Sequence, residues 1–300
     1  MRYLDQFGQT GVVGTDRNHL NYPWAVTVLK DGSIIVSDNE NQRLVRLTED
    51  FKYIDQFGET GVAGTDREHV SYIRDLAVCK DGSILAVCVM KDSHRLIRFT
   101  EDLKYLDQFG GVTGSDREHL LNLAGVSVCK DGSILVADRD NQRLIRFTED
   151  LKYIDQFGET LVPGTDREHL NYPEYVSVAK DGSILVADSG NFRLIRISED
   201  LKYIDQFGET GVIGTDREHF TTPYNITVCK DGSIIVSDSL NERIVHLTED
   251  LKYIDQFGET SIAGTDREHF SWPHGVAVCK DGSILVADQE NHRLIRLSQD

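Results

Sequence analysis

The sequence predicts an all-β protein, a six-bladed β-propeller with four antiparallel strands in each blade. Three observations lead to this fold. The chain of 300 residues contains six similar units, each close to 50 residues long. Within each unit, four short segments have the composition of β-strands, and no segment keeps a helical hydrophobic period. Units of this size with four strands are typical of propeller blades packed around a channel.

The sixth unit shows the expected elements in order. Its first strand is GVAVCK (275–280), and a two-residue turn at Asp281 and Gly282 should close a hairpin, because both residues tolerate positive φ. The second strand, SILVAD, is an unbroken apolar run that predicts burial on both faces. RLIRL (Arg293–Leu297) is the third strand. After an SQD or TED turn comes a KYIDQF-type strand, polar enough for an outer edge.

The two ends of the chain indicate how the ring closes. RYLDQF at the N-terminus is only a fourth strand, and the C-terminus stops after a third strand. Pairing them would complete the sixth blade and remove two free sheet edges, whereas an open solenoid would need polar caps. We therefore predict one domain over residues 1–300, with blades at 23–58, 73–110, 123–158, 173–208, 223–258, and 273–300 plus 1–8.

The repeated unit resembles a known family. PHGVAVCKDGSILVADQENHRLIRL (Pro273–Leu297) is similar to an NHL repeat, which combines a P-x-G-V-A-V strand, a D-G turn, V-A-D and N-x-R. Related runs begin at Pro23, Pro173 and Pro223, and at Leu123, where leucine replaces the proline. The resemblance implies a six-bladed propeller. Its likeness to the NHL domains of tripartite-motif proteins implies a sensor or adaptor domain of a larger protein.

The second unit departs from this pattern. AVCVMKDSHRL stands where the first unit has VSDNENQRL, so the segment is two residues longer and lacks the Asp and Asn of the motif. The third unit then loses two residues after its QFG. Because the two changes compensate each other, we expect a locally distorted second blade that is still complete.

Composition narrows the classes of partner. The chain has 50 acidic and 32 basic residues, a net charge of −18, and no Lys/Arg cluster is evident along it. Such a surface repels nucleic-acid backbones and anionic membranes. The sequence has no signal peptide, no membrane-spanning run and no C-x-x-C spacing among its five cysteines. These features predict a cytoplasmic, monomeric propeller without disulfides, cofactor or metal, which could be part of a multidomain chain.

Variation between the units indicates a binding surface. In a propeller, the one-to-two and three-to-four turns lie on one rim, and here they are nearly constant (KDGS and TED). The fourth-to-first and second-to-third loops lie on the other rim and differ between units, by selection or by neutral drift of exposed loops. Because function in such folds lies on loops held by a rigid framework, we predict that this variable rim binds a protein or peptide. The candidate residues are Trp24, Asn39, Glu40, Gln42, Arg74, Asp75, Lys91, His94, Arg139, Asp140, Gln142, Glu174, Tyr175, Phe192, Tyr224, Asn225, Leu240, Glu242, Trp272, His274, Glu290 and His292.

Within this set we expect the aromatic residues to act as anchors, because large aromatic side chains dominate many protein interfaces. These are Trp24, Tyr175, Phe192, Tyr224 and Trp272. Charged neighbours such as Arg74, Arg139 and Glu174 would add polar contacts.

A second set of polar residues recurs in five units at fixed spacing. A catalytic set is normally assembled once, so repetition favours a structural role, in which an Arg–carboxylate pair and an Asn brace the turn of each blade. The residues of this predicted structural staple are Asp38, Asn41, Arg43, Asp138, Asn141, Arg143, Asp188, Asn191, Arg193, Asp238, Asn241, Arg243, Asp288, Asn291 and Arg293.

Three other functions are weighed against partner binding. Some NHL propellers bind RNA on this rim, but the net charge of −18 disfavours it here. A metal-dependent hydrolase or lyase would use Glu174, Asn225 and His274 near the channel mouth, but these are too few ligands for a full site. Sugar binding by the rim aromatics is the third. Without a catalytic motif, the sequence predicts that the chain is not an enzyme.

Overall fold

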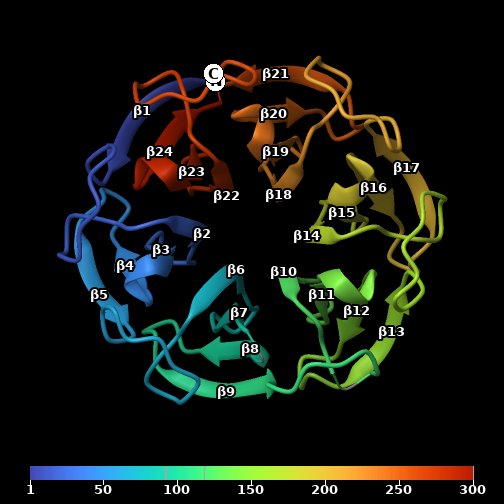
Figure 1. Cartoon of the computed structure of the whole chain (residues 1–300), viewed down its shortest axis with the longest axis horizontal. Coiled ribbons are helices and arrows are strands. Elements are labelled where there is room, and N and C mark those ends of the chain that lie inside the picture. Colours follow the sequence, from blue (N-terminus) through green and yellow to red (C-terminus); the bar gives the residue numbers. More distant parts are fainter. Residues whose placement is uncertain (92, 118, 300) are drawn as a thin grey trace.

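Six four-stranded sheets stand around a central channel (Figure 1). The computed structural model describes residues 1–91, 93–117 and 119–299. The first strand of each blade lies next to the channel and the fourth lies at the outer wall (Figure 1). The predicted six-bladed propeller is therefore confirmed.

The strands run in chain order from the channel outward in the first five blades. The first three blades are β2 (Pro23–Val28), β3 (Ile34–Asp38), β4 (Arg43–Leu47), β5 (Tyr53–Phe57); β6 (Tyr72–Val78), β7 (Ile84–Met90), β8 (Ser93–Phe99), β9 (Tyr105–Gly110); and β10 (Leu123–Val128), β11 (Ile134–Asp138), β12 (Arg143–Phe147), β13 (Tyr153–Phe157). The other three are β14 (Pro173–Val178), β15 (Ile184–Asp188), β16 (Arg193–Ile197), β17 (Tyr203–Phe207); β18 (Pro223–Val228), β19 (Ile234–Asp238), β20 (Arg243–Leu247), β21 (Tyr253–Phe257); and β22 (Pro273–Val278), β23 (Ile284–Asp288), β24 (Arg293–Ser298), β1 (Arg2–Phe7).

Short 3-10 helices join the second and third strands in five blades. They are η1 (Asn39–Asn41), η2 (Arg139–Asn141), η3 (Ser189–Asn191), η4 (Ser239–Asn241) and η5 (Gln289–Asn291). No helix in the described part of the chain has the length and apolar character needed to cross a membrane.

The ring closes as the ends of the sequence predict. Strand β1 pairs with β24 in antiparallel register, Tyr3 opposite Leu297 and Gln6 opposite Ile295. The N-terminal ammonium of Met1 lies 2.8 Å from the Asp255 carboxylate in the neighbouring blade. The two chain ends therefore meet in one blade (Figure 1), where β1 covers the outer edge of β24 and completes the four-stranded sheet.

The hydrophobic core lies between the blades. Second strands such as β3 and β23 are buried along their whole length, as their unbroken apolar runs predict. Val36 of the first blade packs in one cluster with Leu285 and Ala287 of the sixth. All five cysteines are buried and free.

The residues of the predicted staple are buried and hydrogen-bonded to one another. In the fourth blade, Asp188 accepts hydrogen bonds from the Asn171 backbone N–H (2.7 Å), the Asn191 amide (2.8 Å) and the Arg193 guanidinium (2.8 Å). Arg193 also donates to the backbone carbonyls of Thr165, Asp166 and His169. One carboxylate thus ties the second strand to both loops at the variable end of the blade.

The turn between first and second strands differs from the sequence expectation. The Gly282 N–H donates to the Cys279 carbonyl (3.1 Å), and the Cys279 N–H donates to the Ser283 carbonyl (2.8 Å). Lys280 and Asp281 are therefore the central residues, and Gly282 follows them at φ 93°. The two-residue Asp-Gly turn was wrong, because the positive φ is needed one residue later, as in a type I turn with a glycine bulge. This shift places Lys280 at the tip of the turn.

The second blade is complete but distorted, as expected. Its β7–β8 hairpin extends to the pair Met90–Ser93, where the other blades have a 3-10 helix. Cys88 stands in place of the staple aspartate and lies 3.6 Å from the Arg95 guanidinium. Arg95 is buried, and no carboxylate pairs with it among the described residues. Without the Asp, the hairpin takes a different path at the variable rim.

Candidate functional site

The variable rim is the end of the ring formed by the fourth-to-first and second-to-third loops. In each regular blade these two loops contact each other: the Glu40 N–H donates to the Asn21 carbonyl, and the Glu290 N–H to the Ser271 carbonyl. The sequence positions that differ most between units therefore come together on one surface around the channel.

Aromatic side chains of three first strands, β2, β18 and β22, form a cluster on this side. The rings of Trp24 and His274 stack with centroids 4.0 Å apart, and Tyr224 meets His274 edge-on at 4.4 Å. Burial lowers the pKa of His274 to about 3, so the imidazole is neutral. The side chain of Gln289 interacts with the His274 ring. Trp24 and Tyr224 therefore pack against His274 and, with ring centroids 5.7 Å apart, against each other.

Polar side chains from the second, fourth and fifth blades interact at the same end. Asp75 accepts hydrogen bonds from the backbone N–H groups of Leu76 (2.7 Å) and Val126 (2.6 Å). The hydroxyl of Tyr175 interacts with the Asp75 carboxyl group and with Asn225. Burial raises the pKa of Asp75 to about 8, which keeps the carboxyl group largely protonated at neutral pH.

A charged cluster links the third and fourth blades. The Arg139 guanidinium contacts the Glu174 carboxylate and lies 2.6 Å from the Asp140 carboxylate. It also lies 4.6 Å from the centre of the Tyr172 ring. Of the predicted rim residues, Arg139 therefore pairs with both Asp140 and Glu174.

A pocket opens beside the distorted second blade. It has a volume of about 650 Å³ and lies between the first three blades. The longer β7–β8 hairpin supplies Val89, Met90 and Lys91, and β6 supplies Tyr72 and Arg74. The other lining residues are Gln42, Ala63, Ser71, His94, Leu121, Asn122 and Asp140. The irregular unit therefore produces a cavity of the size that ligands occupy.

The charges in this pocket are unbalanced. No salt bridge involves Arg74 or Lys91 in the described ranges, and Asp140 is paired with Arg139. His94 accepts a hydrogen bond from the Asn122 N–H at 2.7 Å, and burial lowers its pKa, so it adds no charge at neutral pH. The pocket thus offers two cations beside the apolar side chains of Val89 and Met90.

The structure divides the 22 predicted rim residues into three groups. Five are exposed: Glu40, Lys91, Leu240, Trp272 and Glu290. Eight are half-buried: Trp24, Gln42, Arg74, Arg139, Asp140, Tyr175, Phe192 and Tyr224. Nine are buried: Asn39, Asp75, His94, Gln142, Glu174, Asn225, Glu242, His274 and His292.

The buried group holds blades together and does not form an outer face. The side chains of His94, Gln142, Glu242 and His292 accept hydrogen bonds from backbone N–H groups of the next blade. Sequence variation alone did not distinguish these positions, which are buried between blades, from the positions on the surface of the rim. Tyr72 and Tyr172 also lie on this rim and were not predicted, although an aromatic residue beside the proline position was a signal.

The described residues contain no preformed metal site. In the part of the chain that the structure describes, no group of three or more His, Cys, Asp or Glu side chains is placed to hold a metal ion. Glu174, Asn225 and His274 all lie at the channel end of the rim, but Glu174 is engaged by Arg139 and His274 is stacked on Trp24.

Comparisons with known proteins support the fold. The model of the NHL repeat matches residues 20–47, 120–147 and 270–297. A search of curated proteins gives no match. Among solved structures, virginiamycin B lyase from Staphylococcus aureus is 15% identical, with 99% of each chain covered and a TM-score of 0.63. A gluconolactonase from Xanthomonas campestris is 12% identical (99% of this chain, 91% of that chain, TM-score 0.66). An auxiliary nutrient binding protein from Bacteroides thetaiotaomicron is 11% identical (98% and 75%, TM-score 0.71).

These likenesses correct one prediction. The prediction that the chain is not an enzyme is contradicted, because lyases and a gluconolactonase are built on the same fold. The absence of a recognised catalytic motif therefore does not support that conclusion. At identities this low the likeness itself extends to the fold alone. The repeat matches and the ring of six sheets identify the chain as a six-bladed β-propeller that carries NHL repeats in its first, third and sixth blades.

Proposed function

We propose that the variable rim is a recognition surface for a protein or peptide, and that an acidic group of the partner occupies the pocket of the second blade. The observation that carries this proposal is the pair of cations, Arg74 and Lys91, in a cavity of about 650 Å³. A carboxylate entering the pocket would gain charge-assisted hydrogen bonds, which are stronger than neutral ones. The apolar side chains of Val89 and Met90 would contact the rest of the bound group.

Exposed aromatic and aliphatic side chains extend this surface around the rim. Trp272 is 42% exposed, Tyr172 43% and Leu240 49%. Tyr172 and Trp272 carry a rigid, apolar ring next to polar loops, as anchors of protein interfaces do. Together with the pocket they support a partner that spans several blades.

A pair of substitutions tests the role of the pocket. In the Arg74→Gln/Lys91→Gln variant we expect the affinity for acidic peptides to fall at least about tenfold, because hydrogen bonds to charged groups contribute about 1.5–3 kcal/mol. The measurement is fluorescence anisotropy with short labelled peptides of acidic, neutral and basic composition and with an RNA pool.

The Lys152→Gln/Lys202→Gln variant is the matched control, because it changes net charge equally at exposed lysines outside the pocket. Its affinity should stay close to that of the parent protein. Equal weakening in both variants, no preference for acidic peptides, or tighter binding of RNA would contradict the proposal.

Catalysis at the channel end of the rim is a second candidate function. The buried carboxyl group of Asp75 favours it, because a pKa of about 8 suits proton transfer near neutral pH. His274, with a pKa of about 3, would be a weak base. The test is incubation with a streptogramin B antibiotic and with gluconolactone, followed by mass spectrometry. Product formation that is lost in Asp75→Asn would support this candidate, and no product from either compound would remove these two reactions.

A further inference from the structure

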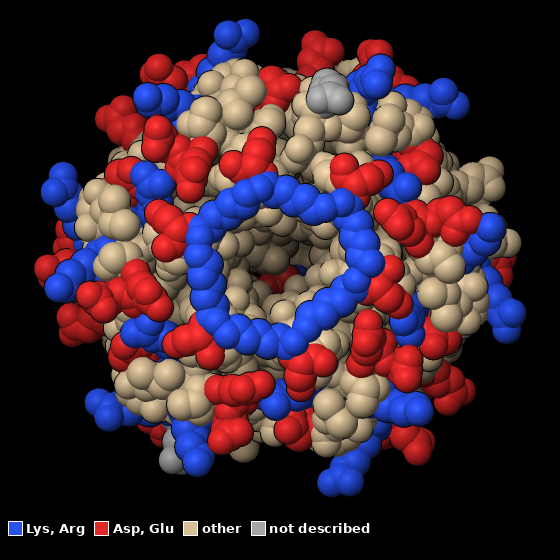
Figure 2. All heavy atoms as spheres, turned by 180° about the vertical axis from the view of Figure 1, so that it is seen from behind, with Lys and Arg blue, Asp and Glu red and all other residues tan. Residues whose placement is uncertain are grey.

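The opposite end of the channel carries six lysines from equivalent turns. They are Lys30, Lys80, Lys130, Lys180, Lys230 and Lys280, and all six are exposed. Each is a central residue of the turn between the first and second strands, so the sixfold arrangement of the blades places all of them around one opening. Figure 2 shows them as a closed ring around the channel mouth. Spaced about 50 residues apart, they form no cluster in the sequence.

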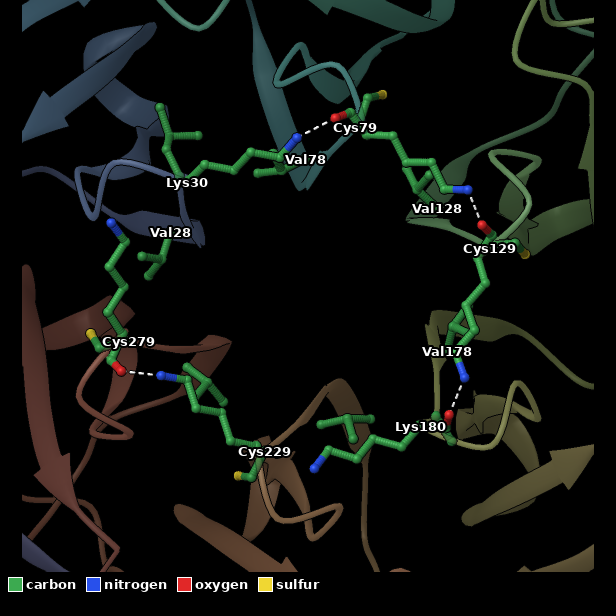
Figure 3. Close-up of a pocket in the computed structure, with 18 residues that line it drawn as sticks. Val28, Lys30, Val78, Cys79, Val128, Cys129, Val178, Lys180, Cys229 and Cys279 are labelled. Atoms are coloured by element: carbon green, nitrogen blue, oxygen red, sulfur yellow. Dashed lines mark hydrogen bonds between the residues drawn. The ribbon is translucent and has the colours of Figure 1, made fainter.

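The lysine side chains run around the opening from one blade to the next (Figure 3). The ammonium group of Lys30 donates a hydrogen bond to the Lys80 carbonyl, Lys80 to Lys130, Lys130 to Lys180, and Lys230 to Lys280. A lysine ammonium has three N–H donors. In these four lysines one donor is used along the ring, which leaves two donors for a ligand in the opening.

The ring encloses a cavity of about 730 Å³. Its wall below the ammonium groups is apolar, formed by Val28, Val78, Val128, Val178, Val228 and Val278 with the Leu, Cys or Ala that follows each. An anion would therefore remain at the level of the lysines. Low-polarity walls also strengthen the attraction between the ammonium groups and a bound charge.

The ring lysines lack carboxylate partners. No salt bridge in the described ranges includes any of them. The aspartate after each lysine is held by its own turn, as Asp281 accepts hydrogen bonds from the Ser283 N–H (2.8 Å) and hydroxyl (2.6 Å). In Figure 2 the acidic side chains form a belt outside the ring. Six like charges around one opening repel each other, and an anion at the centre relieves that repulsion.

We propose that this lysine ring binds a small phosphate-rich polyanion, of the class of inositol polyphosphates and short polyphosphates. The ligand must be compact, because the opening is closed on all sides by the blades (Figure 3). It must also carry several anionic groups, since ammonium donors surround it. A nucleic-acid strand fits less well, because most of it would lie over the acidic belt of a chain with net charge −18. This site lies at the opposite end of the channel from the variable rim and does not depend on the function proposed there.

Calorimetric titration of the full chain with myo-inositol hexakisphosphate at low salt tests the site. We expect saturable binding with one ligand per chain. In the Lys30→Gln/Lys130→Gln/Lys230→Gln variant the affinity should fall at least about tenfold, because half of the ring charges are removed. Lys52→Gln/Lys152→Gln/Lys252→Gln is the control, since it changes net charge equally at exposed lysines away from the ring, and its affinity should change by less than about twofold.

Thermal unfolding distinguishes lost binding from lost structure. Without ligand, the ring variant should unfold at or above the temperature of the parent protein, because removing like charges relieves repulsion. The ligand should stabilise the parent and the control, and not the ring variant. No binding, equal weakening in ring and control variants, or an equal effect of inorganic sulfate would overturn the proposal, because each would indicate general charge attraction without a site.

Discussion

Replacing Asp188 with alanine is expected to lower the free energy of unfolding by about 3–5 kcal/mol, the usual cost of removing one partner of a buried ion pair. Asp188 is 0% exposed, and Arg193 beside it is also buried. The substitution leaves the Arg193 guanidinium, the Asn191 amide and one backbone N–H without their common acceptor. Urea-induced unfolding at neutral pH measures the change.

The control for this prediction is Asp205→Ala. Asp205 also pairs with an arginine, Arg196 at 2.5 Å, but its side chain is 41% exposed. An exposed pair contributes at most about 1 kcal/mol, so the control should lose little stability. If the two variants lose similar amounts, Asp188 is not a staple of the blade. The unpaired Arg95 of the second blade already shows that one blade folds without this carboxylate.

The largest pH effect is expected from Asp75. Its folded pKa of about 8 lies above the unfolded value of about 3.9, so the folded chain keeps a proton that the unfolded chain has lost. The contribution of Asp75 to stability therefore falls as pH rises through this window. An Asp75→Asn variant lacks this titration, and its stability relative to the parent should increase by about 3–4 kcal/mol between about pH 5 and pH 8.

Asp281→Asn is the matched control for the pH series. Hydrogen bonds from Ser283 lower the pKa of Asp281, so this group titrates below the range that is measured. Its stability relative to the parent should stay constant from about pH 5 to pH 8. Urea unfolding of the three proteins at several pH values gives the comparison. Parallel curves for the parent and Asp75→Asn would show that Asp75 is already ionised in the folded state.

The sequence was most informative where a local pattern repeats. The apolar SILVAD runs predicted buried second strands, and the unmatched RYLDQF and RLIRL segments at the two ends predicted how the ring closes. These inferences succeeded because burial on both faces follows directly from an unbroken apolar run of strand length, and strand pairing follows from the need to pair sheet edges.

Other features depended on exact backbone geometry. A shift of one residue in the position of positive φ moved Lys280 from the end of a strand to the tip of a turn. The two extra residues of the second unit lengthen the β7–β8 hairpin, and this hairpin supplies Val89, Met90 and Lys91 to a pocket. Burial also separated Trp272, which is exposed, from His274, two residues away and covered by Trp24.

By itself, the sequence determined the number of blades, their strands, the closure of the ring and the end of the channel at which the units differ. Only the tertiary structure decided which residues of the variable rim reach the surface. It also showed that six lysines, far apart in the sequence, form one ring. The physical reason is that a repeated sequence fixes contacts within a blade and between neighbouring blades. A site at the channel, by contrast, takes one side chain from each of the six blades. Such a site exists only after the ring has closed.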